Sequence, residues 1–258
     1  MIQTRVVFVI LLALFFCPKN SFSQIGVGQE VGILAGPAGF FTDYGERWNV
    51  KNNLENGGFG VGLVYYINFA YRPKCSCKAD ESWFSRYFKV RSEIDYFQSR
   101  LEHFGPVAEA DSEGGRQLRA MHGKTQIIQF GGSLEYHPLG IREFRDFATL
   151  FAPYIGVGVH AVHYNPSAYS DLGDFDSPKV LFSTFEGGLN LERGTTFAII
   201  GNAGVRYRIG RNSDLMIEGK LQYYNSDYID GLDVQGPQNK FNDFVMWVNM
   251  GYIFYLNF

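Results

Sequence analysis

Apolar and polar residues alternate along the last thirteen residues of the chain. Every second residue from Met246 to Phe258 is apolar, while Asn249, Gly251 and Asn257 fall between them. A period of two is typical of a β-strand with one apolar face, and over this length it excludes a helix. Seven earlier segments alternate in the same way: 30–40, 58–71, 88–102, 124–138, 151–164, 197–209 and 215–224. The pattern therefore predicts eight strands.

The connections between these segments fall into two kinds. Long connections at 42–57, 103–123, 165–196 and 225–243 alternate with shorter ones, of which 210–213 has four residues. Short turns at one end and long loops at the other are typical of outer-membrane barrels, and an even strand count places both termini in the periplasm. We therefore predict an all-β fold, a transmembrane antiparallel barrel of eight strands with long extracellular loops. The alternative has ten strands and uses 180–191 as an extra hairpin.

The polar faces of the predicted strands carry charges of both signs. An eight-stranded barrel has an interior just wide enough for side chains to fill, so we expect these charges to pair and plug the lumen. The alternative is a water-filled channel lined by the same residues. The expected lumen charge network is Lys89, Arg91, Glu93, Asp95, Glu135, Arg206, Arg208, Glu218 and Lys220, with Glu30, His137 and His160 also on inward positions.

Aromatic residues stand at both ends of the predicted strands, as expected of the two membrane interfaces. The periplasmic set is Tyr71, Phe88, Tyr136, Phe151, Tyr207 and Phe258, and the outer set is Phe41, Phe59, Tyr96, Tyr164, Phe197 and Phe244. In the periplasmic connection 141–151, apolar residues recur at helical spacing. This segment is either a short amphipathic helix in the membrane interface or an ordered turn packed under the barrel.

Composition agrees with this fold and adds an export signal. The chain has 258 residues and a formal net charge of −3, which gives no bulk basic character for binding nucleic acid. A mean hydropathy of −0.12 is too low for a bundle of membrane helices. Residues 1–23 combine Arg5, a short apolar run and a Ser21-Phe22-Ser23 cleavage site, so they predict a cleaved signal peptide before one barrel domain at 24–258.

Cys75 and Cys77 lie two residues apart in the second connection. The cell envelope is oxidising, so we predict a local disulfide between them, although one across so short a span is strained. The alternatives are a metal site or a bridge to another molecule.

The sequence predicts no catalytic, cofactor or metal site. His103, His122 and His163 could combine with Asp227 or Asp230 into a hydrolase site at the outer rim, but polar loop residues also meet by chance. The acidic loop 171–176 lacks the spacing of a calcium motif. No glycine-rich phosphate loop precedes a helix, which excludes a nucleotide-dependent enzyme.

The final strand resembles the last strand of Gram-negative outer-membrane barrels, in which the assembly machinery reads an aromatic terminal strand. The corresponding residues are Tyr252, Phe254, Leu256 and Phe258. The chain from residue 24 onward also resembles a flavobacterial (Bacteroidetes-type) family of outer-membrane β-barrel proteins. The matching stretches are Glu30-Val31-Gly32 with Gly36-Pro37, 60–69 followed by Tyr71-Arg72, 101–105, 118–123 and 251–257. Some members carry a glutamate dehydrogenase name, which an exported chain without a dinucleotide motif does not support.

The long loops carry aromatic residues of the kind that anchor interfaces, namely Trp48, Phe104, Tyr169 and Phe175. We therefore predict a non-enzymatic structural or partner-binding protein. Its expected partners are outer-membrane lipid, the barrel assembly machinery and another envelope protein that the loops bind. The alternatives are a small porin and a barrel hydrolase.

Overall fold

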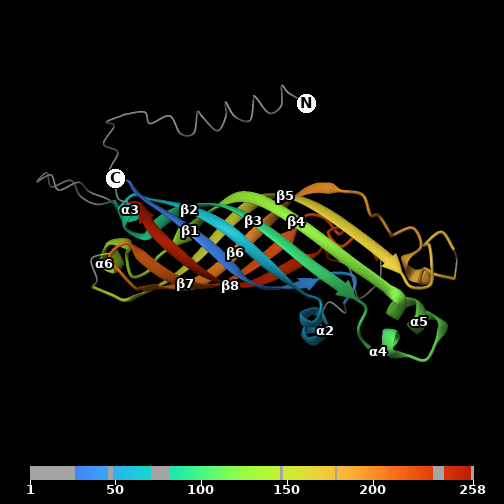
Figure 1. The fold of residues 1–258 in the computed structure, drawn as a ribbon. Helices are drawn as coiled ribbons and strands as arrows, with labels where there is room; N and C mark the ends of the chain where they lie inside the picture. The colour runs from blue at the N-terminus through green and yellow to red at the C-terminus, as the bar shows by residue number, and fades with distance from the viewer. Residues whose placement is uncertain are drawn as a thin grey trace, which may run out of the picture.

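The chain closes into a barrel of eight antiparallel strands (Figure 1). The computed structural model describes residues 27–45, 49–70, 82–145, 148–177, 179–234 and 241–256. Each strand pairs with its neighbours in sequence, and β1 pairs with β8 to complete the ring. The strands are β1 (Gly28–Phe41), β2 (Gly57–Asn68), β3 (Phe88–Glu102), β4 (Met121–Tyr136), β5 (Phe151–Ser170), β6 (Gly194–Arg208), β7 (Ser213–Tyr224) and β8 (Phe244–Leu256).

This topology confirms the predicted eight-stranded barrel, and the ten-stranded alternative is wrong. The segment 180–191 is not a hairpin: it contains a 3-10 helix, η1 (Ser183–Phe185), and a single bridge from Leu189 to Leu232. The signal peptide, Cys75, Cys77, Phe258 and Trp48 lie outside the described residues.

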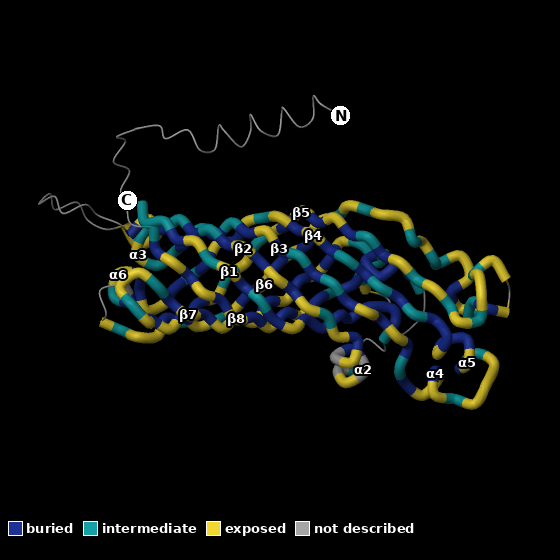
Figure 2. Tube along the Cα trace, in the orientation of Figure 1, coloured by how far each residue is buried: buried dark blue, intermediate teal, exposed yellow. Residues whose placement is uncertain are grey.

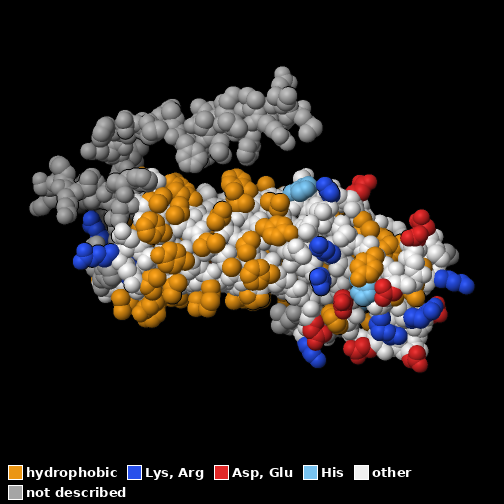
Figure 3. Space-filling view, in the orientation of Figure 1, with side chains coloured by type: hydrophobic (Ala, Val, Ile, Leu, Met, Phe, Trp, Pro, Cys, Tyr) orange, Lys and Arg blue, Asp and Glu red, His pale blue; other side chains and the backbone are white. Residues whose placement is uncertain are grey.

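The strands expose apolar residues and bury charged ones, which reverses the arrangement in a water-soluble protein. In β7, Leu215, Ile217 and Leu221 are exposed, whereas Glu218 and Lys220 are buried. The same alternation runs along every strand (Figure 2). Hydrophobic side chains cover a wide band on the visible face of the barrel (Figure 3), and exposed apolar residues lie on every strand. An apolar surface of this extent needs a hydrocarbon solvent, so the strands span a membrane.

Five short helices lie in the connections: α2 (Val50–Glu55), α3 (Trp83–Tyr87), α4 (Pro106–Glu109), α5 (Glu113–Ala120) and α6 (Ile141–Arg145). No helix in the described ranges is long and apolar enough to cross a membrane. The helices α3 and α6 lie at the end of the barrel where β8 terminates, and α2, α4 and α5 lie toward the opposite end (Figure 1). We refer to these as the periplasmic and outer ends.

The periplasmic connection after β4 is a packed turn and not an interfacial helix. Its helix α6 has only five residues, and the side chains of Ile141 and Phe144 are buried. The ring of Phe144 lies 4.8 Å from the Arg208 guanidinium, at the periplasmic mouth of the lumen. The structure therefore favours the second of the two interpretations of this segment.

At the periplasmic end, Phe88, Tyr136, Phe151 and Tyr207 face outward as predicted, while Tyr71 and Phe258 lie outside the described residues; the outer girdle is confirmed only in part. Outward aromatic side chains pack in pairs at the periplasmic rim, for example Phe151 with Tyr207 at 5.0 Å between ring centroids. Two assignments to the outer girdle are wrong, because Tyr164 and Phe41 are only 8% and 5% exposed. Tyr164 has the inward parity of β5, and the ring of Phe41 is stacked on that of Phe244.

Strands β4 and β5 extend further outward than predicted. Their pairing continues from Tyr136 opposite Ile155 to Met121 opposite Ser170. Residues 121–123 and 165–170, predicted as loop, are therefore strand. The extension carries this side of the barrel beyond the apolar band.

Candidate functional site: the lumen and its outer cap

The lumen is crossed by ion pairs at its periplasmic level. The carboxylate of Glu30 on β1 lies 2.6 Å from the Lys89 ammonium on β3 and 2.5 Å from the Arg206 guanidinium on β6. Next to them, Arg208 and Asp214 are register partners on β6 and β7, 3.1 Å apart. All five side chains are nearly or completely shielded from solvent. Ion pairs therefore connect strands β1, β3 and β6 across the lumen at this depth.

Arg91 on β3 organises the middle level. Its guanidinium makes two hydrogen bonds to Glu218 on β7, at 2.5 and 3.1 Å. It also donates to Glu135 at 3.0 Å and to Glu93 at 2.8 Å. A guanidinium suits this position because its planar fork can bind several carboxylates at once. Glu218 accepts further hydrogen bonds from Tyr154, Asn202 and Asn249.

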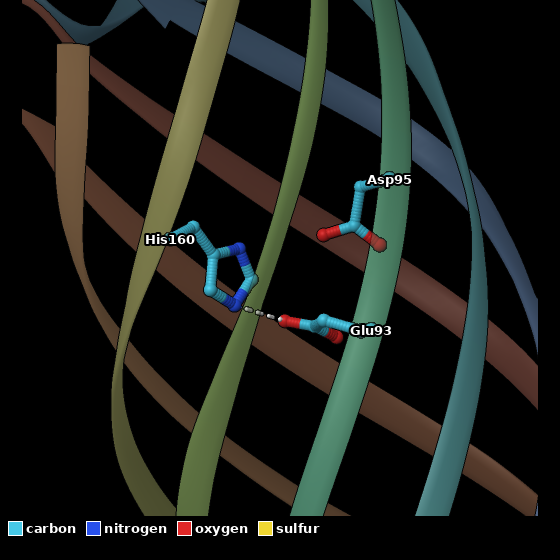
Figure 4. A group of neighbouring side chains, drawn as sticks. All are labelled: Glu93, Asp95 and His160. Carbon is cyan, nitrogen blue, oxygen red and sulfur yellow. Dashed lines mark ion pairs between the residues drawn. The ribbon is translucent and has the colours of Figure 1, made fainter.

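At the outer level of the network, Lys220 on β7 holds two carboxylates of β3. Its ammonium lies 2.8 Å from Glu93 and 3.2 Å from Asp95. His160 reaches Glu93 from β5, with 2.9 Å between Nε2 and the carboxylate (Figure 4). Strand β4 lies between β3 and β5, and Gly131 is the register partner of both residues. Because Gly131 has no side chain, the imidazole can pass over the intervening strand.

Apolar side chains fill the lumen above the charges. Phe97 and Trp247 meet edge to face with 4.9 Å between ring centroids. Trp247 also lies over the Lys220 ammonium at 4.8 Å and donates its indole N–H to the Gly36 carbonyl. These buried rings separate the charged network from the outer loops.

The outer loops close over this plug with a stack of three rings. His103, just after β3, lies between Tyr44 and Phe185, at 4.5 and 5.1 Å from their ring centroids. Burial lowers the pKa of His103 to about 3, because the charged imidazolium would lose its hydration. The imidazole is therefore neutral at physiological pH and packs as an aromatic ring.

Carboxylates at the outer end hold the loops together by binding backbone N–H groups. Asp230 accepts from the N–H groups of Asp43 and Leu232, and Asp43 accepts from Val234 in return. Asp243 accepts from the N–H of Ile229. Burial raises the pKa of Asp230 to about 7 despite these hydrogen bonds. The connections after β1 and after β7 therefore form one cap.

Two clusters in the described residues have the composition of a cation site. Ligand atoms of Glu93, Asp95 and His160 lie within 4.8 Å of one another (Figure 4). The ammonium of Lys220 already serves as the cation for both carboxylates of this cluster. The second cluster is Asp43, Asp227 and Asp243 in the outer cap. Because Asp43 and Asp243 already bind backbone N–H groups, a structural role explains their positions.

The hydrolase site considered from the sequence is not assembled. His103 lies in the aromatic stack, and His122 lies 3.4 Å from Asp171 and 3.7 Å from Glu102. His163 is exposed on the outside of β5. The three histidines are thus in three different settings, and Asp230 serves the loop backbone instead of an imidazole.

The structure places all nine predicted network residues in the lumen, each in contact with an oppositely charged side chain. Asp214 was missed because the seventh strand was predicted to begin at Leu215. Its parity matches that of Glu218, so a one-residue extension would have found it. Of the predicted assembly signal, Tyr252 and Phe254 face outward on β8, and Leu256 ends the strand.

No protein-family model matches the sequence, and no curated protein matches it significantly. Several solved outer-membrane barrels resemble the fold at low identity. Ail of Yersinia pestis is 13% identical with a TM-score of 0.43, over 89% of this chain and 99% of its own. Neisserial surface protein A is 15% identical with a TM-score of 0.41, over 89% and 98%. A major outer-membrane protein of Thermus thermophilus is 10% identical with a TM-score of 0.47, over 88% and 99%. At these values the likenesses carry no argument about function.

Proposed function

We propose that the protein is an integral outer-membrane barrel, closed to solutes, that presents its outer loops to a partner at the cell surface. The observation that supports closure is the series of ion pairs across the lumen at three depths. They join β1 to β3 and β6, β3 to β7, and β5 to β3. A solute would have to separate several buried pairs in turn, and leaving a buried charge without its partner costs about 3–5 kcal/mol.

Placement in the outer membrane is part of this proposal. It rests on the export signal expected in residues 1–23, the apolar exterior of the barrel and the aromatic final strand. The assembly machinery would recognise that strand. The flavobacterial resemblance indicates that the host is a Gram-negative bacterium of the Bacteroidetes type. Membrane fractionation and heat-modifiable gel migration test the placement. Recovery of the protein as a soluble periplasmic species would refute it.

The loop surface supports the choice of partner binding over transport or catalysis. Tyr169 at the outer end of β5 is 62% exposed, and Val107 and Phe241 in the outer loops are 56% and 57% exposed. Exposed aromatic side chains such as Tyr169 are of the kind that anchors protein interfaces. Phe175 instead packs partly against the core, so it stabilises the loops. The proposal includes a non-enzymatic role, which this surface and the separated histidines support.

Site-directed photocrosslinking on whole cells tests the loop surface. A crosslinking residue at position 107 or 169 should trap one discrete envelope protein or surface ligand. A matched crosslinker at Ile217, which is exposed on the lipid-facing side of β7, should trap no such species. Identical products from all three positions, or none from the loop positions, would refute partner binding.

A further inference from the structure

Strands β3 and β4 place two cations directly opposite each other, just outside the apolar band. Arg100 and Lys124 are register partners with outward side chains. Like charges at such paired positions, about 4.5–5.5 Å apart at Cβ, destabilise a sheet. In the described part of the chain neither side chain has an ion pair. Glu102, two residues further along β3, lies 3.7 Å from His122 instead. Among the described residues, none therefore serves as a counter-ion to this pair.

A pocket opens on the outer wall next to this pair. It has a volume of about 190 Å³ and is lined by Tyr96, Gln126, Ile128, His163, Asn165 and Arg193. Gln126 follows Lys124 at the next outward position of β4. The Nε of Arg193 donates to the Asn165 carboxamide at 3.1 Å, which fixes the guanidinium at the pocket and leaves its other N–H groups for a ligand. The lining is thus rich in hydrogen-bond donors.

The pocket lies where the apolar band ends. In Figure 3, Lys, Arg and His side chains gather at the border between the orange band and the polar outer end. Below the pocket, β3 and β4 expose Ile94, Ile128 and Phe130 toward the membrane. A ligand that fits both the basic pocket and the apolar wall below it has an anionic group at headgroup depth and hydrocarbon chains along the barrel wall.

We propose that Arg100, Lys124 and the pocket beside them bind the phosphate-bearing headgroup of a glycolipid in the outer leaflet. Arginine and lysine are the side chains best suited to phosphate, and charge is screened less at the edge of a hydrocarbon layer than in open water. The bound phosphate would supply the counter-charge that the register pair lacks. This inference rests on the membrane placement in the proposed function and adds a ligand outside the lumen and the loops.

The test measures binding of diphosphorylated lipid A to the full-length barrel in neutral detergent, by native mass spectrometry. The double variant Arg100→Gln with Lys124→Gln should weaken binding by about tenfold or more, since two charge-assisted contacts are lost. Arg193→Gln should weaken it by a few-fold (~3-fold). The control Arg211→Gln removes an exposed positive charge from the turn at the periplasmic end and should leave binding unchanged.

Three outcomes would overturn the inference: equal affinity in the double variant and the control, equal binding of lipid A and its dephosphorylated form by the wild type, or equally tight binding of inorganic phosphate alone. The two wild-type comparisons hold even if a variant fails to fold, and heat-modifiable migration identifies such a variant. A closed, membrane-embedded barrel without phosphate preference would refute only the lipid site. A conducting barrel that retains the preference would refute only the proposed function.

Discussion

Replacing Arg91 by Met tests whether the lumen is dry. The guanidinium is fully buried and donates hydrogen bonds of 2.5 to 3.1 Å to Glu93, Glu135 and Glu218. Its removal leaves these carboxylates without their shared cation. Breaking a buried pair in this way costs about 3–5 kcal/mol. The same change in a water-filled channel would cost about 1 kcal/mol or less, because solvent would screen the remaining charges.

Urea unfolding in lipid vesicles, followed by tryptophan fluorescence, measures this difference. We expect Arg91→Met to lower the free energy of unfolding by at least about 3 kcal/mol. Adding Glu218→Gln should recover part of the loss, with a coupling energy of roughly 1–3 kcal/mol, because one uncompensated charge is then removed. Arg211→Met, in an exposed turn, is the control and should lie within about 0.5 kcal/mol of the wild type. A loss below about 1 kcal/mol for Arg91→Met would refute the dry, paired lumen.

Three further changes have definite expected outcomes. Gly131→Ala should destabilise the barrel by about 1–3 kcal/mol in the same assay, because the new Cβ would lie 2.2 Å from the His160 ring and 2.3 Å from a backbone oxygen. Gly219→Ala, with no atom within 4 Å of the new Cβ, is its control, and equal losses would contradict the packing argument. His103 has a folded-state pKa below its unfolded value, so its contribution to stability is present above about pH 6.5 and is lost toward pH 3. The free energy of opening the outer loops, measured by proteolysis, should fall over that range by about 1.4 kcal/mol per pH unit. It should fall less in His103→Phe, and identical pH profiles of the two proteins would contradict this. Replacing Cys75 and Cys77 by Ser should leave heat stability nearly unchanged, since a bridge this local constrains little of the unfolded chain. Thiol labelling with and without reductant detects the bridge, and full labelling without reductant would rule it out.

The strand parity in the sequence was enough to predict which residues face the lumen. Lys89, Arg91, Glu93 and Asp95 occupy every second position of one segment, and any strand at that place must send them to one side. The partner of each charge could not be predicted, because it depends on the stagger between distant strands. Arg91 finds Glu218 more than a hundred residues away, on a strand that is not its neighbour in the barrel.

The outer cap had no periodic signal at all. The ring stack joins Tyr44, His103 and Phe185 from three separate connections, and the burial of His103 could not be inferred from any spacing. The basic pair on the outer wall, Arg100 opposite Lys124, likewise depends on the register of β3 against β4, which strand parity alone does not give although both residues lie in predicted strands. Tyr164 is the opposite case. Its inward parity could be read from the sequence, but its place near a strand end led to its assignment to the outer girdle.

Single-channel recording in planar bilayers tests the closed lumen most directly. Purified full-length protein, shown to be folded by its heat-modifiable migration, is inserted and held at both polarities in neutral salt. The ion pairs that bridge β1, β3, β5, β6 and β7 predict no stable conductance above that of the bare bilayer. A reproducible open channel of uniform size would contradict the closed barrel and would assign Arg91, Arg206 and Lys220 to the wall of a pore.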